Sequence, residues 1–372
     1  MNTIVQVAAF LLLGVVILFG AHFFVYVSLV RFFAVTASAS KYLIASLLVF
    51  LSVSFIFSSI IAHAYENIAT RTAYFLSGFW LGFLVNVVLA CTALWLILWA
   101  GRSLGFAPNK ALWGAVFIGL AFLVSLYGVW HALHPEVKHI IVRIPGIPDI
   151  WKGQTIVQLS DVHLGHVYQG DFLRGIVAQV NALHPKLVVI TGDLFDGMDG
   201  RLDFLVQPFN TISAENGVFF VTGNHETYLG VEKAFTALQD TQVTILHDEV
   251  RDIDGLRLIG ISFPARGEEK DIIATLGFLR DQYLGRPNVL LYHAPTRIAE
   301  VAQSGVNLML SGHTHQGQQF PFSSITHLVH KGYDYGLYPI GEFTLYTTSG
   351  AGTWGPTMRI GTRSEIVAIT IE

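Results

Sequence analysis

Histidine, aspartate and asparagine side chains gather in five short clusters in the second half of the 372-residue chain. Each cluster follows an apolar run, as in LSDVH, ITGDLFD, VTGNHE, LLYHAP and LSGHTH. The side chains with metal-binding or acid–base chemistry are Asp161, His163, Asp193, Asn224, His225, His293, His313 and His315. Their nitrogen and oxygen atoms, without sulfur, suit Mn²⁺, Fe or Zn²⁺ better than copper or an iron–sulfur cluster.

Taken singly, these residues have ordinary explanations. An aspartate at the end of a strand often caps a helix, and Asn224 is typical of a turn. A lone histidine such as His293 is more often a hydrogen-bonded core residue than a ligand. Five such clusters together favour a metal site, with enough ligands for two ions if one carboxylate bridges them. Two cations held close together can activate a water and stabilise the charge of a phosphoryl group.

The segments between the clusters alternate between strand-like and helix-like patterns. Strands are predicted at 155–160, 186–193, 217–224, 256–262, 288–294 and 307–313, with a closing pair at 343–350 and 365–372. Helices are predicted at 171–183, 231–240, 270–282 and 295–303. This alternation predicts an α/β domain, and right-handed crossovers should bring the clusters to one carboxyl-terminal sheet edge. Gly192, Gly223 and Gly312 adjoin the candidate ligands, where we expect a close approach of the backbone.

The first third of the chain has a different composition. Over the whole chain 52% of residues are hydrophobic and 13% are charged, against roughly 25% charged in average globular proteins. Four stretches without Asp, Glu, Lys or Arg each exceed the roughly 20 residues that a helix needs to cross a bilayer. Transmembrane helices are therefore predicted at about 4–30, 42–62, 74–100 and 111–133. The first lacks the basic start and short apolar core of a signal peptide, so we interpret it as a span.

We accordingly divide the chain into a membrane region, 1–134, and a second domain, 135–372. Lys and Arg residues flank the predicted spans equally on both sides. The first span favours an external second domain, because Arg31 and Lys41 follow it and no Lys or Arg precedes it. The aromatic-rich segment 319–343 is compatible with a lipid-dipping segment, a lid or a packed surface loop.

The order D-x-H, G-D, G-N-H-E, H and G-H-x-H resembles the motif of the calcineurin-like metallophosphoesterases, over roughly residues 135–372. The lead-in VKHIIVRIPGIPDIWKGQTIVQLSDVHLGH resembles the YkuE-type, membrane-associated branch of that family. This branch is similar to the UDP-diacylglucosamine pyrophosphatases. The resemblance implies an α/β phosphoesterase domain, which is a β-sandwich flanked by helices and follows the four-helix transmembrane region in the sequence.

The resemblance also implies roles for the clustered residues. One ion would be held by Asp161, His163, Asp193 and His315. Asp193 would bridge to a second ion, which Asn224, His293 and His313 would complete. His225 would instead protonate the leaving oxygen or stabilise the transition state. Gln316-Gly317-Gln318 stands where the family has Gly-Gly-Gln, and this departure at the first glycine affects the shape of the pocket. Asp196, His166 and Tyr168 adjoin the motifs and are candidates for contacts with the metal ligands or the substrate.

Together these features predict a membrane-anchored hydrolase of phosphomonoester, phosphodiester or pyrophosphate bonds that uses two divalent metal ions. Its substrate would be a phosphorylated small molecule or a lipid-linked phosphate. The alternative is a catalytically weak metal-binding domain that regulates or scaffolds a membrane transport or sensing module. The net charge of −4 and the lack of a basic cluster argue against nucleic acid as a partner. Cys91 is the single cysteine, which excludes an intramolecular disulfide, and nothing predicts an oligomeric state.

Overall fold

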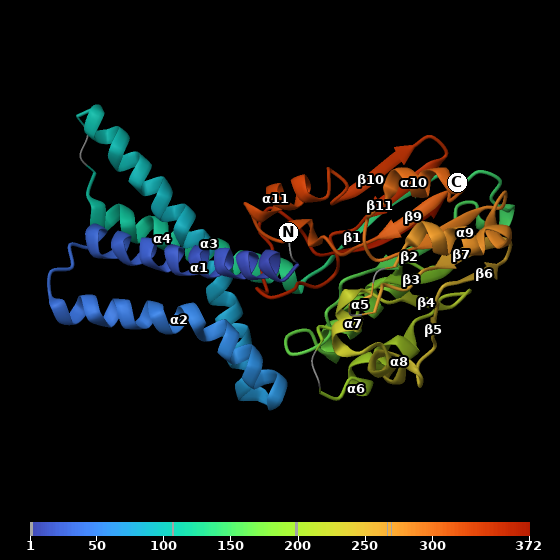
Figure 1. The fold of residues 1–372 in the computed structure, drawn as a ribbon, viewed down its shortest axis with the longest axis horizontal. Coiled ribbons are helices and arrows are strands. Elements are labelled where there is room, and N and C mark those ends of the chain that lie inside the picture. The colour runs from blue at the N-terminus through green and yellow to red at the C-terminus, as the bar shows by residue number, and fades with distance from the viewer. Residues whose placement is uncertain (1–2, 106–107, 198–199, 266, 269) are drawn as a thin grey trace. The chain divides into compact units, whose positions relative to one another are not determined.

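The computed structural model describes residues 3–105, 108–197, 200–265, 267–268 and 270–372 (Figure 1). The chain forms two compact units, Met1–Val129 and Trp130–Glu372. Within the described residues, the first unit consists of long helices, and the second combines two sheets with shorter helices.

The helices of the first unit are apolar around their whole circumference. They are α1 (Thr3–Phe32), α2 (Ser38–Ala64), α3 (Ile68–Ser103) and α4 (Lys110–Leu133), and the last turn of α4 belongs to the second unit. In the part of the chain that is described, these four are long and apolar enough to cross a membrane. Large side chains such as Leu43 and Phe50 are exposed, as expected of helices that face lipid. The four predicted apolar helices are therefore confirmed.

Buried polar side chains in this unit bond to one another across the helices. His22 Nε2 accepts a hydrogen bond from Trp80 Nε1 at 3.0 Å, and its Nδ1 lies 2.8 Å from the Leu18 carbonyl oxygen. Asn86 Nδ2 donates to Ser125 Oγ at 2.7 Å, which joins α3 to α4. Polar contacts of this kind hold transmembrane helices together, so His22 has a structural explanation.

The second unit contains two six-stranded mixed sheets among its described residues. The first has the order β1 (Glu136–Val142), β12 (Glu365–Ile371), β2 (Thr155–Leu159), β3 (Leu187–Thr191), β4 (Val218–Val221) and β5 (Val243–Ile245). The second has the order β10 (Gly336–Ile340), β11 (Phe343–Thr347), β9 (Leu308–Ser311), β8 (Asn288–Leu291), β7 (Leu256–Gly260) and β6 (Glu249–Ile253). The site-bearing strands β2, β3 and β4 are mutually parallel, as are β7, β8 and β9.

Alternate side chains of these strands enter different hydrophobic layers. In β3, Val189 packs into the core between the two sheets, whereas Val188 and Ile190 pack toward α5 (Gly170–Ala182) and α8 (Val231–Leu238). On the second sheet, α9 (Ile272–Tyr283) and α10 (Ile298–Gln303) cover the other outer face. Because both faces are buried, the central strands β3, β4, β8 and β9 are nearly continuous apolar runs. The predicted β-sandwich flanked by helices is confirmed.

One detail of the predicted topology is wrong. The last two predicted strands both form, but they do not pair with each other: β11 lies beside β9 in the second sheet, and β12 lies between β1 and β2 in the first. Their apolar pattern indicates buried strands but contains no information about the partner. Residues 348–364 cross between the two sheets along the ends of β2 and β9, where Ala351 N donates to the Ser160 carbonyl and Thr348 N to the Ser311 carbonyl.

Short helices complete the unit. They are η1 (Asp149–Trp151), α6 (Asp203–Val206), η2 (Gln207–Thr211), α7 (Asn224–Leu229), η3 (His315–Gly317) and α11 (Phe322–Val329). Two of them bear directly on the clustered residues, because α7 begins with Asn224 and His225 and η3 begins with His315.

Candidate metal centre

The structure brings the five polar clusters to one edge of the sandwich. They follow β2, β3 and β4 of the first sheet and β8 and β9 of the second, at the carboxyl end of each strand. Backbone hydrogen bonds tie neighbouring clusters together: Asp161 N donates to the Gly192 carbonyl at 3.0 Å, and Gly312 N donates to the His293 carbonyl at 2.8 Å. The parallel order of the strands thus fixes where the side chains meet.

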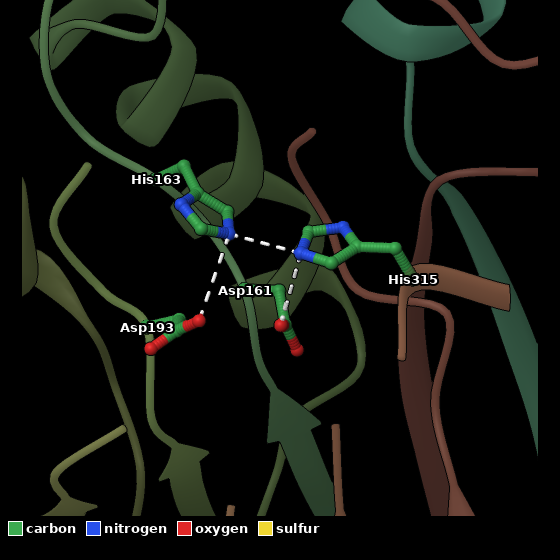
Figure 2. A group of neighbouring side chains, drawn as sticks. All are labelled: Asp161, His163, Asp193 and His315. Atoms are coloured by element: carbon green, nitrogen blue, oxygen red, sulfur yellow. Dashed lines mark hydrogen bonds and ion pairs between the residues drawn. The ribbon is translucent and has the colours of Figure 1, made fainter. Parts of the chain in front are cut away.

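The first group contains Asp161, His163, Asp193 and His315, drawn in Figure 2. Each residue offers one ligand atom, and these four atoms all lie within 4.8 Å of one another. His163 Nε2 lies 3.0 Å from His315 Nε2, which in turn lies 3.2 Å from Asp161 Oδ1. All four residues are buried, so their polar atoms face one another rather than solvent.

The second group shares Asp193 with the first and adds His293 and His313. Asp193 Oδ2 lies 3.1 Å from His293 Nε2 and 3.9 Å from His163 Nε2, so the same oxygen faces both groups. His313 Nδ1 and the side-chain oxygen of Asn224 lie 3.2 Å and 3.1 Å from His293 Nε2. The seven side chains predicted as ligands therefore form two overlapping clusters with Asp193 between them.

Electrostatics of this site favour a bound cation. Burial lowers the pKa of His313 to about 3 and holds the pKa of His315 well below its usual value, so both rings are neutral, as metal ligands must be. Burial alone would lower the pKa of His293, but the Asp193 carboxylate outweighs it and raises the pKa to about 9. A proton on His293 therefore compensates the negative charge of the buried Asp193 carboxylate. A bound cation would supply that positive charge instead. The sulfur-free donor set fits Mn²⁺, Fe or Zn²⁺.

Five of the seven residues have backbone torsions that non-glycine residues seldom adopt. The φ angles are 51° at Asp161, 53° at His163, 49° at Asp193, 71° at His313 and 50° at His315. Such conformations cost roughly 1–3 kcal/mol each and concentrate at functional sites. The backbone is therefore shaped to direct these side chains inward, at a cost that the surrounding sandwich offsets.

His225 lies beside the first group rather than within it. Its backbone N–H donates to Asp193 Oδ1 at 2.9 Å, and its ring centroid lies 4.6 Å from that of His163. Nδ1 lies 3.3 Å from the Asp196 carbonyl oxygen, which can only accept, so Nδ1 carries a proton and Nε2 is left for another partner. Burial lowers the pKa of His225, and the neighbouring His163 lowers it further.

Asp196 gains a defined place from the structure. Its Oδ1 lies 3.4 Å from His163 Nδ1 and 4.0 Å from His225 Nδ1, so it adjoins both rings. His163, Asp196 and His225 form a third group of possible ligand atoms within 4.8 Å of one another. The sequence placed Asp196 only beside a motif, in GDLFD.

Sequence reasoning missed Glu226 and Arg359. The Glu226 carboxylate accepts hydrogen bonds from the backbone N–H groups of Gly223, Asp193 and Phe195 at 2.7, 3.0 and 3.0 Å. Burial, together with the nearby Asp193 charge, raises the pKa of this carboxyl to about 7. The Glu226 side chain thus holds the turn that presents Asp193. Its place in G-N-H-E was the only signal available.

Arg359 holds a second part of the site together. Its buried guanidinium donates to the His315 carbonyl at 3.1 Å and to the carbonyls of Ser349 and Gly352 at 2.5 and 2.7 Å. These bonds join the ligand-bearing η3 to the segment that crosses between the sheets. Arg359 lies outside every motif, so no pattern in the sequence could have identified it.

Replacing Glu226 by alanine is expected to lower the free energy of unfolding by about 3 kcal/mol or more, because three buried N–H groups would lose their acceptor. Glu226→Gln keeps an acceptor oxygen and should cost less. Thermal unfolding of the purified full-length chain in detergent, followed by tryptophan fluorescence, measures both. Equal midpoints for the alanine variant and the parent would contradict this role.

Comparison with known proteins agrees with this geometry. The calcineurin-like phosphoesterase family matches residues 154–317. A metallophosphoesterase of Helicobacter pylori is 31% identical over 279 residues, which cover 73% of this chain and 74% of the relative. A bovine transmembrane protein with a metallophosphoesterase domain is 32% identical, over 74% of this chain and 67% of the relative. The metallophosphoesterase YkuE of Bacillus subtilis is 29% identical, over 71% of this chain and 96% of the relative. The chain therefore belongs to the calcineurin-like metallophosphoesterases, hydrolases of phosphoester bonds, and combines their domain with four candidate membrane-spanning helices.

Proposed function

We propose that this protein is a membrane-anchored phosphoesterase that hydrolyses phosphomonoester, phosphodiester or pyrophosphate bonds with two divalent metal ions. The observation that carries the proposal is the position of Asp193 Oδ2, which faces His293 at 3.1 Å on one side and His163 at 3.9 Å on the other. A two-metal site requires a carboxylate that lies between two groups of ligands and can contact an ion in each.

The ligands divide between the two ions as follows. Asp161, His163, Asp193 and His315 would hold one ion, and Asp193, Asn224, His293 and His313 would hold the other. Mn²⁺, Fe or Zn²⁺ suits these donors. When bound, divalent cations here supply Lewis-acid stabilisation of the phosphoryl group and of the attacking water.

His225 is proposed to act as the proton donor to the leaving oxygen. The Asp196 carbonyl orients its ring through Nδ1, which leaves Nε2 for the substrate. The exposed rings of Tyr228 and Trp354 lie 5.5 and 6.3 Å from the His225 ring and border the approach to it. A phosphate group near His225 would favour the protonated imidazole that donation requires.

The membrane region favours a substrate that is itself at the membrane, such as a phospholipid, a polyprenyl phosphate or a lipid-linked sugar nucleotide. For the orientation we propose an external catalytic unit, because four spans would put it on the side of the bilayer opposite to Arg31, which lies in the last turn of α1. A sugar-nucleotide substrate would instead require a cytoplasmic catalytic unit. The alternative, a metal-binding scaffold that regulates the helices, is disfavoured by the complete set of ligands together with His225. Protease treatment of intact cells tests the orientation, since an internal catalytic unit would survive it.

The proposed activity is tested with the full-length chain in detergent and a soluble aryl phosphodiester. Turnover should require added Mn²⁺, stop with a chelator and return when metal is restored. His225→Ala is expected to reduce kcat by about 10²–10⁴-fold while the metal content, measured by elemental analysis, stays that of the parent. Turnover that is insensitive to the chelator would contradict the metal mechanism, and an unchanged kcat in the variant would contradict the role of His225.

A further inference from the structure

Helix α11 presents an apolar face that the described parts of the protein leave uncovered. None of its residues is buried, and Phe322, Ile325, Leu328 and Val329 recur at spacings of three and four, which places them on one side of a helix. Leu328 is 78% exposed. Figure 1 shows α11 at the left-hand end of the catalytic unit, away from α9 and α10, which cover the second sheet. Contiguous exposed apolar surfaces of this kind mark contacts with proteins or membranes.

This helix adjoins the metal centre. It packs against η3, which carries His315, and the approach is close: a Cβ at Gly317 would lie 2.6 Å from Ser323 N. At the other end of α11, the ring of His330 lies 6.1 Å from that of the proposed ligand His313. Whatever the apolar face of α11 contacts therefore lies next to the site.

The last turn of the candidate span α4 belongs to the catalytic unit. The candidate span α4 ends at Leu133, and the Ala132 carbonyl accepts hydrogen bonds from Ser364 Oγ at 3.3 Å and from Tyr168 Oη at 3.4 Å. The hydroxyl groups of Tyr168 and Thr353 lie 2.7 Å apart.

The next links lead from Thr353 toward α11. The following residue, Trp354, donates from its backbone N–H to Gln318 Oε1 at 2.6 Å, and α11 begins four residues after Gln318, at Phe322. A short series of hydrogen bonds thus connects the end of a membrane span to the start of α11.

Composition on this side suits a lipid surface. Within Phe322–Val329 no Asp, Glu, Lys or Arg occurs, and the exposed Lys331 follows the helix, where it can meet anionic headgroups. The exposed aromatic residues Trp354 and Tyr228 border His225, and Trp and Tyr are the residues that prefer the boundary between membrane and water.

We infer that the outer face of α11 lies in the surface of the bilayer that the four helices span, and that it holds the metal centre at the level of the lipid headgroups. The occupant of this face is the lipid itself, because the span that ends at Leu133 keeps the bilayer within reach. For the substrate, the consequence is a phosphoester carried in a lipid headgroup. That consequence rests on the proposed phosphoesterase function, whereas the membrane contact does not.

The contact is tested by fluorescence with the full-length chain in a Cys91→Ala background. A single cysteine replaces Leu328 or, as the matched control, Phe278, an apolar side chain of α9 that is 86% exposed. Each variant is labelled in detergent with an environment-sensitive fluorophore and then reconstituted into vesicles of phosphatidylcholine and phosphatidylglycerol that contain nitroxide-bearing lipid. We expect blue-shifted, quenched emission from position 328 and solvent-like, unquenched emission from position 278.

Solvent-like emission from position 328 would overturn the inference. Blue-shifted emission without quenching would also overturn it, because the face would then be covered by protein, for example by a second copy of the chain. Solvent-like, unquenched emission from position 278 would confirm that exposure of an apolar position does not by itself produce the blue shift and the quenching.

The substrate consequence is tested by a pair of charge substitutions, Leu328→Glu and Phe278→Glu. Leu328→Glu should slow hydrolysis of an acyl-anchored aryl phosphodiester in the vesicles by roughly tenfold and leave the soluble aryl phosphodiester unaffected. Phe278→Glu should change neither rate. Equal loss on both substrates, or no loss on either, overturns the substrate consequence. If the parent hydrolyses neither substrate, the proposed function fails, while the fluorescence result still decides the membrane contact.

Discussion

Asp193→Asn is expected to reduce metal-dependent phosphodiester hydrolysis by at least about 10³-fold. Asp193 is the only described side chain that belongs to both principal ligand groups. Its Oδ2 faces His293 and His163, and its Oδ1 accepts the His225 N–H at 2.9 Å. A metal ion contributes several kcal/mol of transition-state stabilisation, and each 1.36 kcal/mol corresponds to a factor of ten.

The asparagine variant separates charge from shape. It retains an oxygen that can accept the His225 N–H, so the fold should survive, but it removes the negative charge that holds the pKa of His293 at about 9. We expect its metal content to fall together with its activity, as determined by elemental analysis of protein purified in parallel with the parent. Asp203→Asn is the control, at an exposed carboxylate that forms an ion pair with Arg201, and it should leave both quantities unchanged. Full activity of the Asp193 variant would contradict the two-metal proposal.

Gly312→Ala is expected to lower the free energy of unfolding by about 3 kcal/mol and to remove most of the activity. A Cβ at this position would collide with the carboxylate of Asp161 and the hydroxyl of Ser160. Gly312 does not have a positive φ, so the effect would come from the collision and not from backbone strain. Overpacking of a well-packed interior costs about 1–3 kcal/mol, and here the displaced group is a proposed ligand.

Gly175 in α5 provides the matched control, because no atom lies within 4 Å of a Cβ built there. Gly175→Ala should raise stability by about 0.5–1 kcal/mol through the better helix propensity of alanine. Thermal unfolding of both variants in detergent measures the difference, alongside metal-dependent turnover. A Gly312→Ala protein as stable and active as the parent would show that the backbone at the metal centre can move aside.

The location of the site could be predicted because it depends on strand direction. Short apolar runs that each end in a polar cluster indicate buried parallel strands, and parallel strands share one carboxyl edge. Asp161 and Asp193 follow adjacent strands of the first sheet, and His293 and His313 follow adjacent strands of the second. The sequence pattern could not show that the carboxyl edges of the two sheets face each other, because packing in the core between the sheets determines this arrangement.

The roles of Glu226 and Arg359 could not be predicted from the sequence, because both side chains act on backbone groups. Glu226 accepts three N–H bonds and Arg359 donates to four carbonyls, and any carboxylate or guanidinium could do so once the fold has placed it. The departure from Gly-Gly-Gln falls on its first glycine and has a visible outcome: Gln316 adopts a φ angle of 51°, which a glycine would adopt without strain. A side chain is therefore held in a backbone conformation that costs it energy, next to His315.

Strand β12 has a consequence for the order in which the protein can be built. It is the last described strand along the chain, yet it lies between β1 and β2, the first two, and pairs with both. β12 starts at Glu365, more than two hundred residues after Glu136. The strand that joins β1 to β2 is therefore synthesised long after both of them. By then the ribosome has long since delivered the four apolar helices to the membrane. The nascent catalytic unit completes its first sheet while already tethered at the bilayer, and truncation before Glu365 would leave β1 without its neighbour and the sheet unfinished.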